Sequence, residues 1–425
     1  ILTPAFGLDL NRDLAVEPAD ATFFARSDAR LWLSSGRGDV NGDGFDDLVV
    51  GSSYGAGPDG LRRDAGAVYV YFGRSEILPS VDLETDADVI IHGAAEVQRF
   101  GREVIIANLN GDAFDDLIVG SQSYTDDANR NKGRLDVFYG RAAPPSMIDL
   151  AVSSADVTIV GRDRDDDLSS SMAVGDVDGD RTADLVVSAR GAYGPANSRF
   201  LSGEAYVFTN AALLPAFVDL SAYDPPVTIF GAEPGDYLSF EVSIGDLDGD
   251  PYGDIVIGLQ NQYDTSESGV QIVFGRAAWP AAVDLATTPP DVTLEGEIIN
   301  GLSTEFGNAL LVANVVGSAD DDLVVGSFLR NAATGRLYVF DATALATGIA
   351  TSVIDGLGPN TYFGEDIAVG DVDGDADSEL IVTAEGGGLD DHPGNAYVID
   401  VSAGLPALAS LHDLVLDGHV IGAEN

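Results

Sequence analysis

The sequence predicts an all-β protein, a β-propeller of six repeats with four antiparallel strands in each blade, and three observations lead to this prediction. An acidic segment recurs six times along the 425 residues. Short, alternating, β-branched runs bounded by Gly, Asp or Pro surround each copy, which is typical of strands. No stretch follows a helical period over ten residues. Because a small twisted sheet is unstable alone and buries its faces against the next blade, we expect one propeller domain over residues 1–425.

The six acidic segments set the repeat, and they begin 69, 68, 70, 68 and 57 residues apart. They read DVNGDGFDD, NLNGDAFDD, DVDGDRTAD, DLDGDPYGD, NVVGSADDD and DVDGDADSE, at residues 39–47, 108–116, 176–184, 246–254, 314–322 and 371–379. Two strand-like runs follow each segment and two precede it, which makes four strands in a repeat. The repeats then span about 19–87, 88–155, 156–225, 226–290, 291–350 and 351–425.

Oxygen-bearing side chains stand at positions 1, 3, 5 and 9 of these segments. Calcium takes six to eight oxygen ligands, and a tight turn supplies them from these side chains and from the carbonyl of position 7. The glycine at position 4 permits the bend, and magnesium fits less well because it prefers near-ideal octahedra. Position 7 would contribute its backbone carbonyl, from Phe45, Phe114, Thr182, Tyr252 and Asp377. The full set of predicted ligands is Asp39, Asn41, Asp43, Phe45, Asp47, Asn108, Asn110, Asp112, Phe114, Asp116, Asp176, Asp178, Asp180, Thr182, Asp184, Asp246, Asp248, Asp250, Tyr252, Asp254, Asp371, Asp373, Asp375, Asp377 and Glu379.

The fifth segment is an exception, because Val316 and Ser318 stand at positions 3 and 5 between Asn314 and Asp322. We expect a weak or empty site there, and therefore about five calcium ions in the protein. Turn-forming Asp, Asn and Gly would also explain a single segment, but recurrence at one period favours metal loops. Since clustered carboxylates repel one another, the loops should open without a cation, which predicts a structural role for calcium.

Composition limits the partners and the compartment. The chain has 21 basic and 70 acidic residues, a formal net charge of −49, and this field repels nucleic acids and anionic membrane surfaces. No apolar run reaches the roughly 18 residues of a membrane span, so we expect no direct membrane insertion. The absence of cysteine does not exclude secretion in a chain this large. The sequence starts at Ile1 with no signal peptide, from which we expect processing or truncation. Open loops suited to millimolar calcium favour an extracellular or cell-surface protein.

These features resemble the FG-GAP repeat family, the propeller of integrin α subunits and of many bacterial surface proteins. The resemblance rests on the acidic loops, the Val-Gly-Ser runs after them and the pairs Phe100–Gly101, Phe306–Gly307 and Phe363–Gly364. The first, third and fourth repeats depart from the pair and carry Leu31–Trp32, Leu168–Ser169 and Ser239–Phe240. The resemblance implies calcium on the blade hairpins and roles in adhesion or ligand recognition, but no particular ligand.

In this family each blade takes its outer strand from the start of the next repeat, and here one candidate is left over. The seven candidates lie near Ala21–Phe24, Val89–His92, Val157–Val160, Val227–Phe230, Val292–Leu294, Ser352–Ile354 and His419–Gly422. The surplus strand either pairs with a neighbouring copy in a head-to-tail fibre or is a frayed terminus. A seventh blade assembled from residues 1–24 and 402–425 is a further alternative.

Groups that perform catalysis are sparse, since the chain has four histidines and shows no nucleophile elbow, P-loop or zinc spacing. We therefore predict no enzyme, and no catalytic residue, but an extracellular adhesion or structural scaffold that self-assembles into fibres. The first alternative is a lectin-like propeller, with Tyr54, Tyr124, Tyr193 and Tyr263 either as a stacking surface or as packing between blades. A hydrolase or lyase on this scaffold is the second alternative. The expected partners are a protein or glycan ligand and further copies of the chain.

Overall fold

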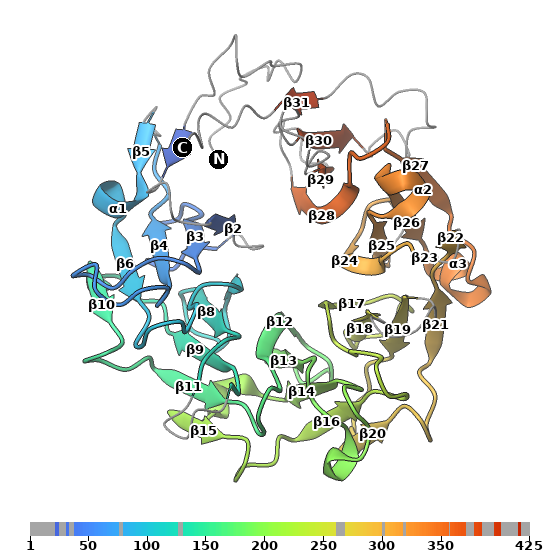
Figure 1. Cartoon of the computed structure of the whole chain (residues 1–425), viewed down its shortest axis with the longest axis horizontal. Coiled ribbons are helices and arrows are strands. Elements are labelled where there is room, and N and C mark those ends of the chain that lie inside the picture. Colours follow the sequence, from blue (N-terminus) through green and yellow to red (C-terminus); the bar gives the residue numbers. More distant parts are fainter. Residues whose placement is uncertain are drawn as a thin grey trace. The chain divides into compact units, whose positions relative to one another are not determined.

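The computed structural model describes residues 22–24, 31–33, 38–75, 80–125, 131–260, 268–299, 302–317, 320–356, 358–370, 378–384, 395–400 and 415–417. Within these ranges the chain forms two compact units. The first unit holds the described residues from 22 to 242 and from 276 to 289, and the second holds the remainder. Each unit contains three antiparallel blades, so the predicted β-propeller of six blades is confirmed for the described part of the chain (Figure 1).

The blades of the first unit share one pattern, in which successive strands pair antiparallel and the next repeat supplies the fourth strand. The first blade consists of β2 (Leu31–Leu33), β3 (Leu48–Ser52), β4 (Ala67–Tyr71) and β6 (Val89–His92). The second consists of β7 (Val104–Ala107), β8 (Asp116–Ser121), β9 (Arg134–Phe138) and β11 (Val157–Val160). The third consists of β12 (Leu168–Gly175), β13 (Asp184–Ala189), β14 (Glu204–Phe208) and β16 (Val227–Phe230).

The second unit repeats this pattern. The fourth blade has β17 (Val242–Gly245), β18 (Asp254–Leu259), β19 (Gly269–Val273) and β21 (Val292–Glu295). The fifth has β24 (Phe306–Ala313), β25 (Asp322–Ser327), β26 (Arg336–Phe340) and β27 (Ser352–Asp355). The sixth has β28 (Phe363–Gly370), β29 (Glu379–Ala384), β30 (Asn395–Asp400) and β31 (Val415–Asp417). The connections hold β22 (Ile298–Ile299), β23 (Leu302–Ser303), α2 (Arg330–Ala333) and α3 (Ala342–Thr347).

A short parallel strand extends each blade of the first unit, so four strands per blade describes these sheets only in part. β10 (Met147–Asp149) joins β6, β15 (Phe217–Asp219) joins β11, and β20 (Ala282–Asp284) joins β16. β5 (Ser80–Asp82) pairs with β1 (Thr22–Phe24) in the same way. Each of these strands ends in Asp after Val or Ile, with Leu as the next residue. The same connections contain the short helical turns α1 (Leu83–Asp86) and η2 (Ala211–Leu213), while η1 (Pro195–Asn197) lies between β13 and β14.

A cation of the blade that receives the added strand holds the terminal Asp of that strand. The ion pairs are Arg62 with Asp149 at 2.6 Å, Lys132 with Asp219 at 3.6 Å and Arg199 with Asp284 at 2.5 Å. The fifth repeat has helix α3 in place of such a strand between β26 and β27. This shorter connection accounts for the spacing of 57 residues between the fifth and sixth acidic segments.

Six of the seven candidate outer strands are strands in the structure, as β1, β6, β11, β16, β21 and β27. The seventh candidate, His419–Gly422, lies outside the described residues. β31 takes the fourth place in the sixth blade, through antiparallel pairing with β30. β1 has β5 as its pairing partner within the described ranges.

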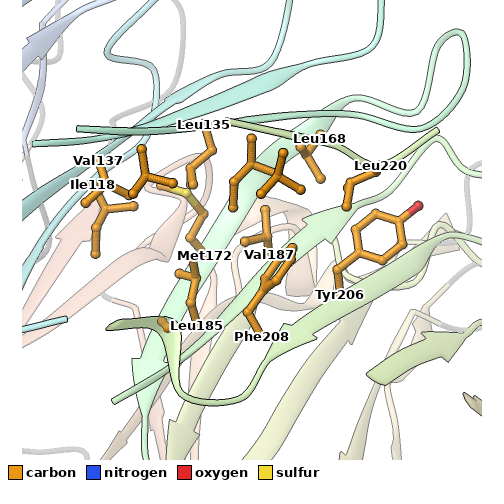
Figure 2. Close-up of a cluster of buried hydrophobic side chains, with 14 of the residues drawn as sticks. Ile118, Leu135, Val137, Leu168, Met172, Leu185, Val187, Tyr206, Phe208 and Leu220 are labelled. Atoms are coloured by element: carbon orange, nitrogen blue, oxygen red, sulfur yellow. The ribbon is translucent and has the colours of Figure 1, made fainter. Parts of the chain in front are cut away.

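Alternating apolar side chains from neighbouring blades build the core between them, as Figure 2 shows for the second and third blades. Leu135 and Val137 of β9 share this cluster with Met172 of β12 and Val187 of β13, and all are at most 4% exposed. Burying one such side chain contributes about 1.5–3 kcal/mol relative to leaving it in water. The blades are therefore held together mainly by these interfaces and not by the strand pairing inside each sheet.

The Phe-Gly position lies at the start of the first strand of a blade or a few residues before it, and it requires left-handed backbone. Gly101, Gly307 and Gly364 have φ of +83°, +90° and +85° there. The third and fourth repeats place Ser169 and Ser239 at this point, with φ of +67° and +69°. Each serine hydroxyl donates to a backbone carbonyl of the blade's neighbour at 2.8 Å, which offsets the strain of a non-glycine residue.

This geometry corrects one detail of the sequence interpretation. In the fourth repeat the pair equivalent to Phe-Gly is Leu238–Ser239, not Ser239–Phe240. Leu238 is fully buried, and Gly203 approaches its backbone as Gly66 approaches that of Phe100. The sequence interpretation was shifted by one residue because Leu238, an aliphatic residue, takes the buried position that phenylalanine occupies in other repeats.

Candidate metal centres

The acidic segments connect the first and second strands of the blades, which is where the sequence predicted metal loops. Segments 39–47, 108–116 and 176–184 lie in the first unit, and 246–254 and 314–322 lie in the second. Residue 9 of a segment begins or directly precedes the second strand, as Asp184 does for β13. A short loop between two paired strands holds its ends at a fixed separation, so its oxygens are brought together by the hairpin itself.

Side-chain oxygens fold each loop by accepting backbone N–H groups a few residues further on. In segment 176–184, Asp176 accepts Gly179 N at 2.7 Å and Arg181 N at 2.8 Å. Asp178 accepts Asp180 N at 3.1 Å, and Asp180 accepts Thr182 N at 2.7 Å. Segment 39–47 repeats these bonds. Segment 246–254 repeats all but the bond from position 6, where Pro251 has no N–H. The successive turns point several oxygens toward the centre of the loop.

Three carboxylates converge in each of two loops. In the first unit these are Asp176, Asp178 and Asp184, and in the second unit Asp246, Asp248 and Asp254, with ligand atoms within 4.8 Å of one another. Negative oxygens this close repel strongly unless a cation lies between them. A donor set made only of oxygen atoms suits a hard cation such as calcium. Asp180 and Asp250, predicted at position 5, lie outside these groups of three.

The first two loops have an amide in place of the carboxylate at position 3. Asn41 donates its side-chain N–H to Asp43 at 2.9 Å, and Asn110 donates to Asp112 at 3.0 Å. The amide oxygens accept the backbone N–H of the same residues at 2.8 Å. These loops therefore have the same fold with one negative charge fewer at position 3.

The carboxylate at position 9 has a structural task that the sequence reasoning did not assign to it. One oxygen of Asp47 accepts Val40 N at 2.8 Å and the other accepts Gly73 N, beyond the third strand, at 2.9 Å. Asp116, Asp184 and Asp254 make the equivalent pairs of bonds. Burial raises the pKa of Asp47, Asp184 and Asp254 to about 6, against the lowering effect of these backbone donors. Position 9 thus joins the loop to the third strand.

The fifth and sixth segments differ from the others. In the fifth, Asn314 accepts Gly317 N at 3.0 Å, and Asp322 accepts Val315 N and Val316 N at 2.8 Å each. Ser318 lies outside the described residues. Of the sixth set, Asp371, Asp373, Asp375 and Asp377 also lie outside them, while Glu379 is buried at the start of β29. In the fifth loop one oxygen of Asp322 therefore accepts both N–H groups of the loop, while its other oxygen is buried without a partner among the described residues, so the bond to the residue beyond the third strand is missing.

Position 8 links the loops of neighbouring blades. Asp115 accepts Asp39 N at 2.8 Å, and Asp115 N donates to Asp39 O at 3.1 Å. Asp321 makes the same two bonds to Asp246, at 3.1 Å and 2.8 Å. The sequence signal was an Asp at position 8 in some segments and not in others, but only the packing of one loop on the next gives it a role.

We expect Asp115→Ala to lower the free energy of unfolding of the first unit by about 1–2 kcal/mol, because Asp39 N loses a charged acceptor. The matched control is Asp46→Ala, which changes position 8 of the first loop, where the side chain is exposed. Urea unfolding in calcium measures both. Equal stability of the two variants would contradict a stabilising link between the two loops through Asp115.

A second group of buried carboxyls lies away from the loops, in the first unit. Glu204 on β14 is 3% exposed and accepts Tyr206 Oη at 2.8 Å, while Arg162 lies over the Tyr206 ring at 5.4 Å. Burial, with the nearby Asp166 carboxyl, raises the pKa of Glu204 to about 7. Burial also raises the pKa of Asp166 to about 6, although Asp163 N donates to it at 2.7 Å.

These shifts predict that the stability rises as the pH falls from 8 to about 5. A carboxyl whose pKa is higher in the folded state binds its proton more tightly there, so protonation between the folded and unfolded pKa values favours folding. Glu204→Gln imitates the protonated form, and we expect it to stabilise the protein by about 1–2 kcal/mol at pH 8 and to leave it unchanged near pH 4. Denaturant unfolding of both proteins across this range checks the sign; a wild-type stability that falls from pH 8 to pH 6.5 is the contrary result.

The recurrent tyrosines contact cations and rings of the first unit. Arg99 lies over Tyr54 at 5.3 Å, Arg134 lies over Tyr124 at 5.4 Å, and Tyr193 contacts Phe200 with ring centroids 5.2 Å apart. Tyr263 lies outside the described residues. The Tyr54 and Tyr124 rings are half-buried and covered by arginine, and Tyr193 packs on Phe200, which is consistent with packing, one of the two roles given to these tyrosines in the sequence analysis.

No helix among the described residues is long and apolar enough to cross a membrane. The histidine at the outer strand of the first blade, His92, is 8% exposed and lies 3.2 Å from Ala56 O, and burial lowers its pKa. A buried, neutral histidine bonded to a carbonyl fits a packing role at this position.

Comparison with known proteins supports the repeats seen in the sequence. The FG-GAP repeat model matches residues 32–71 and 169–208, which cover most of the first and third blades. Integrin alpha-5 of Xenopus laevis is 28% identical over 180 residues, which are 41% of this chain and 16% of that protein.

Greater similarity is found to an enzyme. Phosphatidylinositol-glycan-specific phospholipase D of Mus musculus is 34% identical over 160 residues, 38% of this chain and 18% of that protein. The protein of the same name from Bos taurus is 31% identical over 196 residues, 44% of this chain and 22% of that protein. The chain thus spans about a fifth of the length of these relatives.

These relatives correct two predictions. We predicted a non-catalytic adhesion scaffold that self-assembles into fibres, and no enzyme. Both predictions are contradicted by five relatives that carry the name phosphatidylinositol-glycan-specific phospholipase D, a hydrolase. The error arose because missing catalytic motifs were taken to indicate a missing activity, although one fold serves many functions. The resemblance itself is confirmed: this chain is a β-propeller with FG-GAP repeats, similar to those of integrin α subunits.

Proposed function

We propose that this chain is the calcium-binding propeller of an extracellular hydrolase that acts on phosphatidylinositol glycans. The observation that carries the proposal is the similarity to phosphatidylinositol-glycan-specific phospholipase D in five organisms, at 24–34% identity. The glycan part of such a substrate agrees with the glycan ligand expected from the sequence. The charge of −49 favours contact with the glycan over adhesion of the whole surface to an anionic membrane.

Calcium is assigned to five loops, 39–47, 108–116, 176–184, 246–254 and 371–379. The converging carboxylates Asp176, Asp178 and Asp184, and their counterparts Asp246, Asp248 and Asp254, support this assignment. When bound, the ion neutralises their mutual repulsion. The residues at positions 1, 3 and 9 would hold it, and position 9 would also join the loop to the blade. Segment 314–322 is proposed to remain without calcium, since Val316 offers no side-chain oxygen.

Hydrolysis of a phosphatidylinositol glycan in detergent micelles tests the proposal. We expect the purified hydrolase that contains this propeller to release the glycan head group in calcium and at least 10-fold more slowly in EDTA. The double variant Asp178→Ala with Asp248→Ala, which removes one carboxylate from each of the two clusters, should show the same loss in calcium. The control Asp46→Ala should retain the wild-type rate. No release by the folded protein that contains this propeller, saturated with calcium, is the result that overturns the proposed reaction.

A further inference from the structure

A pocket of about 440 Å³ opens between the first and second blades, apart from the carboxylate clusters. Its walls are mainly apolar, and they include Val40, Val89, Leu117, Phe138 and Pro144. Met147 and Val152 also line the pocket, and 54% and 87% of their surface is exposed. The volume lies within the range of small-molecule sites, which are concave and mostly apolar with a few polar groups.

The chain contains a second copy of the segment that closes this pocket. Residues 141–150 read RAAPPSMIDL, and residues 276–285 read RAAWPAAVDL. Both segments are anchored by the same backbone bonds, from Arg141 N to Val40 O and from Arg276 N to Val177 O, at 3.0 Å each. At the other end Leu150 N and Leu285 N donate to the outer strand of the preceding blade, at 3.0 Å and 3.1 Å. Pro144 therefore stands at the place that Trp279 takes in the second copy.

Trp279 shows what this place accommodates. Its indole Nε1 donates to Val177 O at 3.0 Å, and Arg276 lies 4.9 Å from the ring centroid. Val177 and Val40 are both position 2 of a metal loop. The Val177 carbonyl thus accepts the indole N–H in addition to Arg276 N. Val40 O likewise accepts Arg141 N, and Val40 is one of the residues that line the pocket.

The equivalent place between the second and third blades is filled by other side chains. Leu214 and Tyr223 pack against the buried cluster of that interface, part of which Figure 2 shows. In the segment at the pocket, Pro144 stands three residues before β10, as Leu214 does before β15. Ser153 follows the terminal Asp of β10 by four residues, as Tyr223 follows that of β15. Two small residues replace two large ones, and this difference in side-chain volume accounts for the pocket.

We propose that the pocket binds a small neutral aromatic molecule with one N–H donor, of the indole class. The ring would lie against the apolar walls, and its N–H would donate to Val40 O as Trp279 donates to Val177 O. The ligand should be neutral because the charges at the pocket are already paired, Arg141 with Asp156 at 2.5 Å and Arg62 with Asp149 at 2.6 Å. This site goes beyond the proposed hydrolase function and does not depend on it.

The two methionines of the chain provide a test on the unaltered protein. Met147 lines the pocket, whereas Met172 is 4% exposed in the core between the second and third blades. We expect indole to shift the ¹³C-methyl signal of Met147 in a saturable titration and to leave that of Met172 in place. With 1-methylindole, which has no N–H, the binding should be about 5-fold weaker, as for the loss of one net hydrogen bond. A titration that leaves Met147 unmoved overturns the site, and equal affinity of the two probes overturns the role of Val40 O.

Two tryptophan variants locate the site independently. Pro144→Trp supplies the side chain of the second copy, and we expect it to abolish the indole-dependent shift of Met147. Ala142→Trp is the matched control, because Ala142 is exposed on the same segment, and it should bind as the wild type does. Trp279→Ala should add a second bound indole per chain, measured by calorimetry in calcium. Undiminished binding by a folded Pro144→Trp chain would place the ligand elsewhere.

Discussion

Removal of calcium is expected to lower the melting temperature of the protein by about 15–30 °C. A site occupied at 100 times its dissociation constant stabilises the native state by about 2.7 kcal/mol. A unit of some 240 residues shifts by about 2–4 °C for each kcal/mol, and the first unit alone contains three of the assigned loops. The repulsion among Asp176, Asp178 and Asp184 adds to the loss, because nothing then neutralises it.

Calorimetric melting in 2 mM calcium, in EDTA and in EDTA with excess magnesium checks this expectation. Magnesium should restore little of the loss, since it dehydrates reluctantly and demands a tighter octahedral site. Asp178→Ala should give a smaller calcium-dependent gain than the wild type, while Asp46→Ala should keep the full gain. A melting temperature that calcium does not change would show that the loops are turns and not metal sites.

Asp322→Ala is expected to destabilise the second unit by about 3 kcal/mol in calcium and in EDTA alike. The carboxylate is fully buried and accepts Val315 N and Val316 N, both at 2.8 Å. Its removal leaves two buried donors without an acceptor, which costs about 1–3 kcal/mol for each group. Burial raises the pKa of Asp322, which indicates a cost of holding the charge there, but the lost bonds outweigh it.

Urea unfolding with and without EDTA measures this loss. Asp322→Asn should lose less than Asp322→Ala, because an amide oxygen still accepts the two N–H groups. Asp47→Ala in the first unit is the comparison, since it removes two backbone hydrogen bonds, from Val40 N and Gly73 N, together with a proposed ligand, and its loss should be larger in calcium than in EDTA. A calcium-dependent loss for Asp322→Ala would mean that the fifth loop also binds the ion.

Much of the fold was predictable because each repeat can be recognised from the types of residues that are close together in the sequence. The acidic segments mark one hairpin in each blade, and the alternating apolar runs mark the strands around it, so the six-bladed class and the loop positions follow from the sequence. The outer strands were also predictable, since Val89–His92 and its counterparts have the same alternation as the inner strands.

The rest depends on contacts between distant residues. β10, β15 and β20 are three residues long and are held by parallel pairing and by Arg62, Lys132 and Arg199 of another repeat, which local pattern does not reveal. The task of position 9 was hidden for the same reason: its bond partners, such as Gly73 for Asp47, lie beyond the third strand. The pocket arises where Pro144 and Ser153 stand in place of the larger Leu214 and Tyr223, and this equivalence is visible only once the backbones of the segments are compared.

Function was the least predictable part, since it is not encoded in the repeat pattern. The loops and glycines that define the propeller specify how blades close and bind cations, and the same pattern serves integrin α subunits and phospholipase D relatives alike. The proposal of a hydrolase rests on overall sequence similarity and not on the chemistry of the loops.

Counting the calcium ions bound to the purified chain tests the central assignment most directly. Equilibrium dialysis followed by elemental analysis should find about five ions per chain, and about four in the variant Asp178→Ala. The variant Val316→Asp with Ser318→Asp, which restores acidic residues at positions 3 and 5 of the fifth loop, should add one. A folded chain that retains no calcium at millimolar concentration would contradict the assignment of the acidic loops.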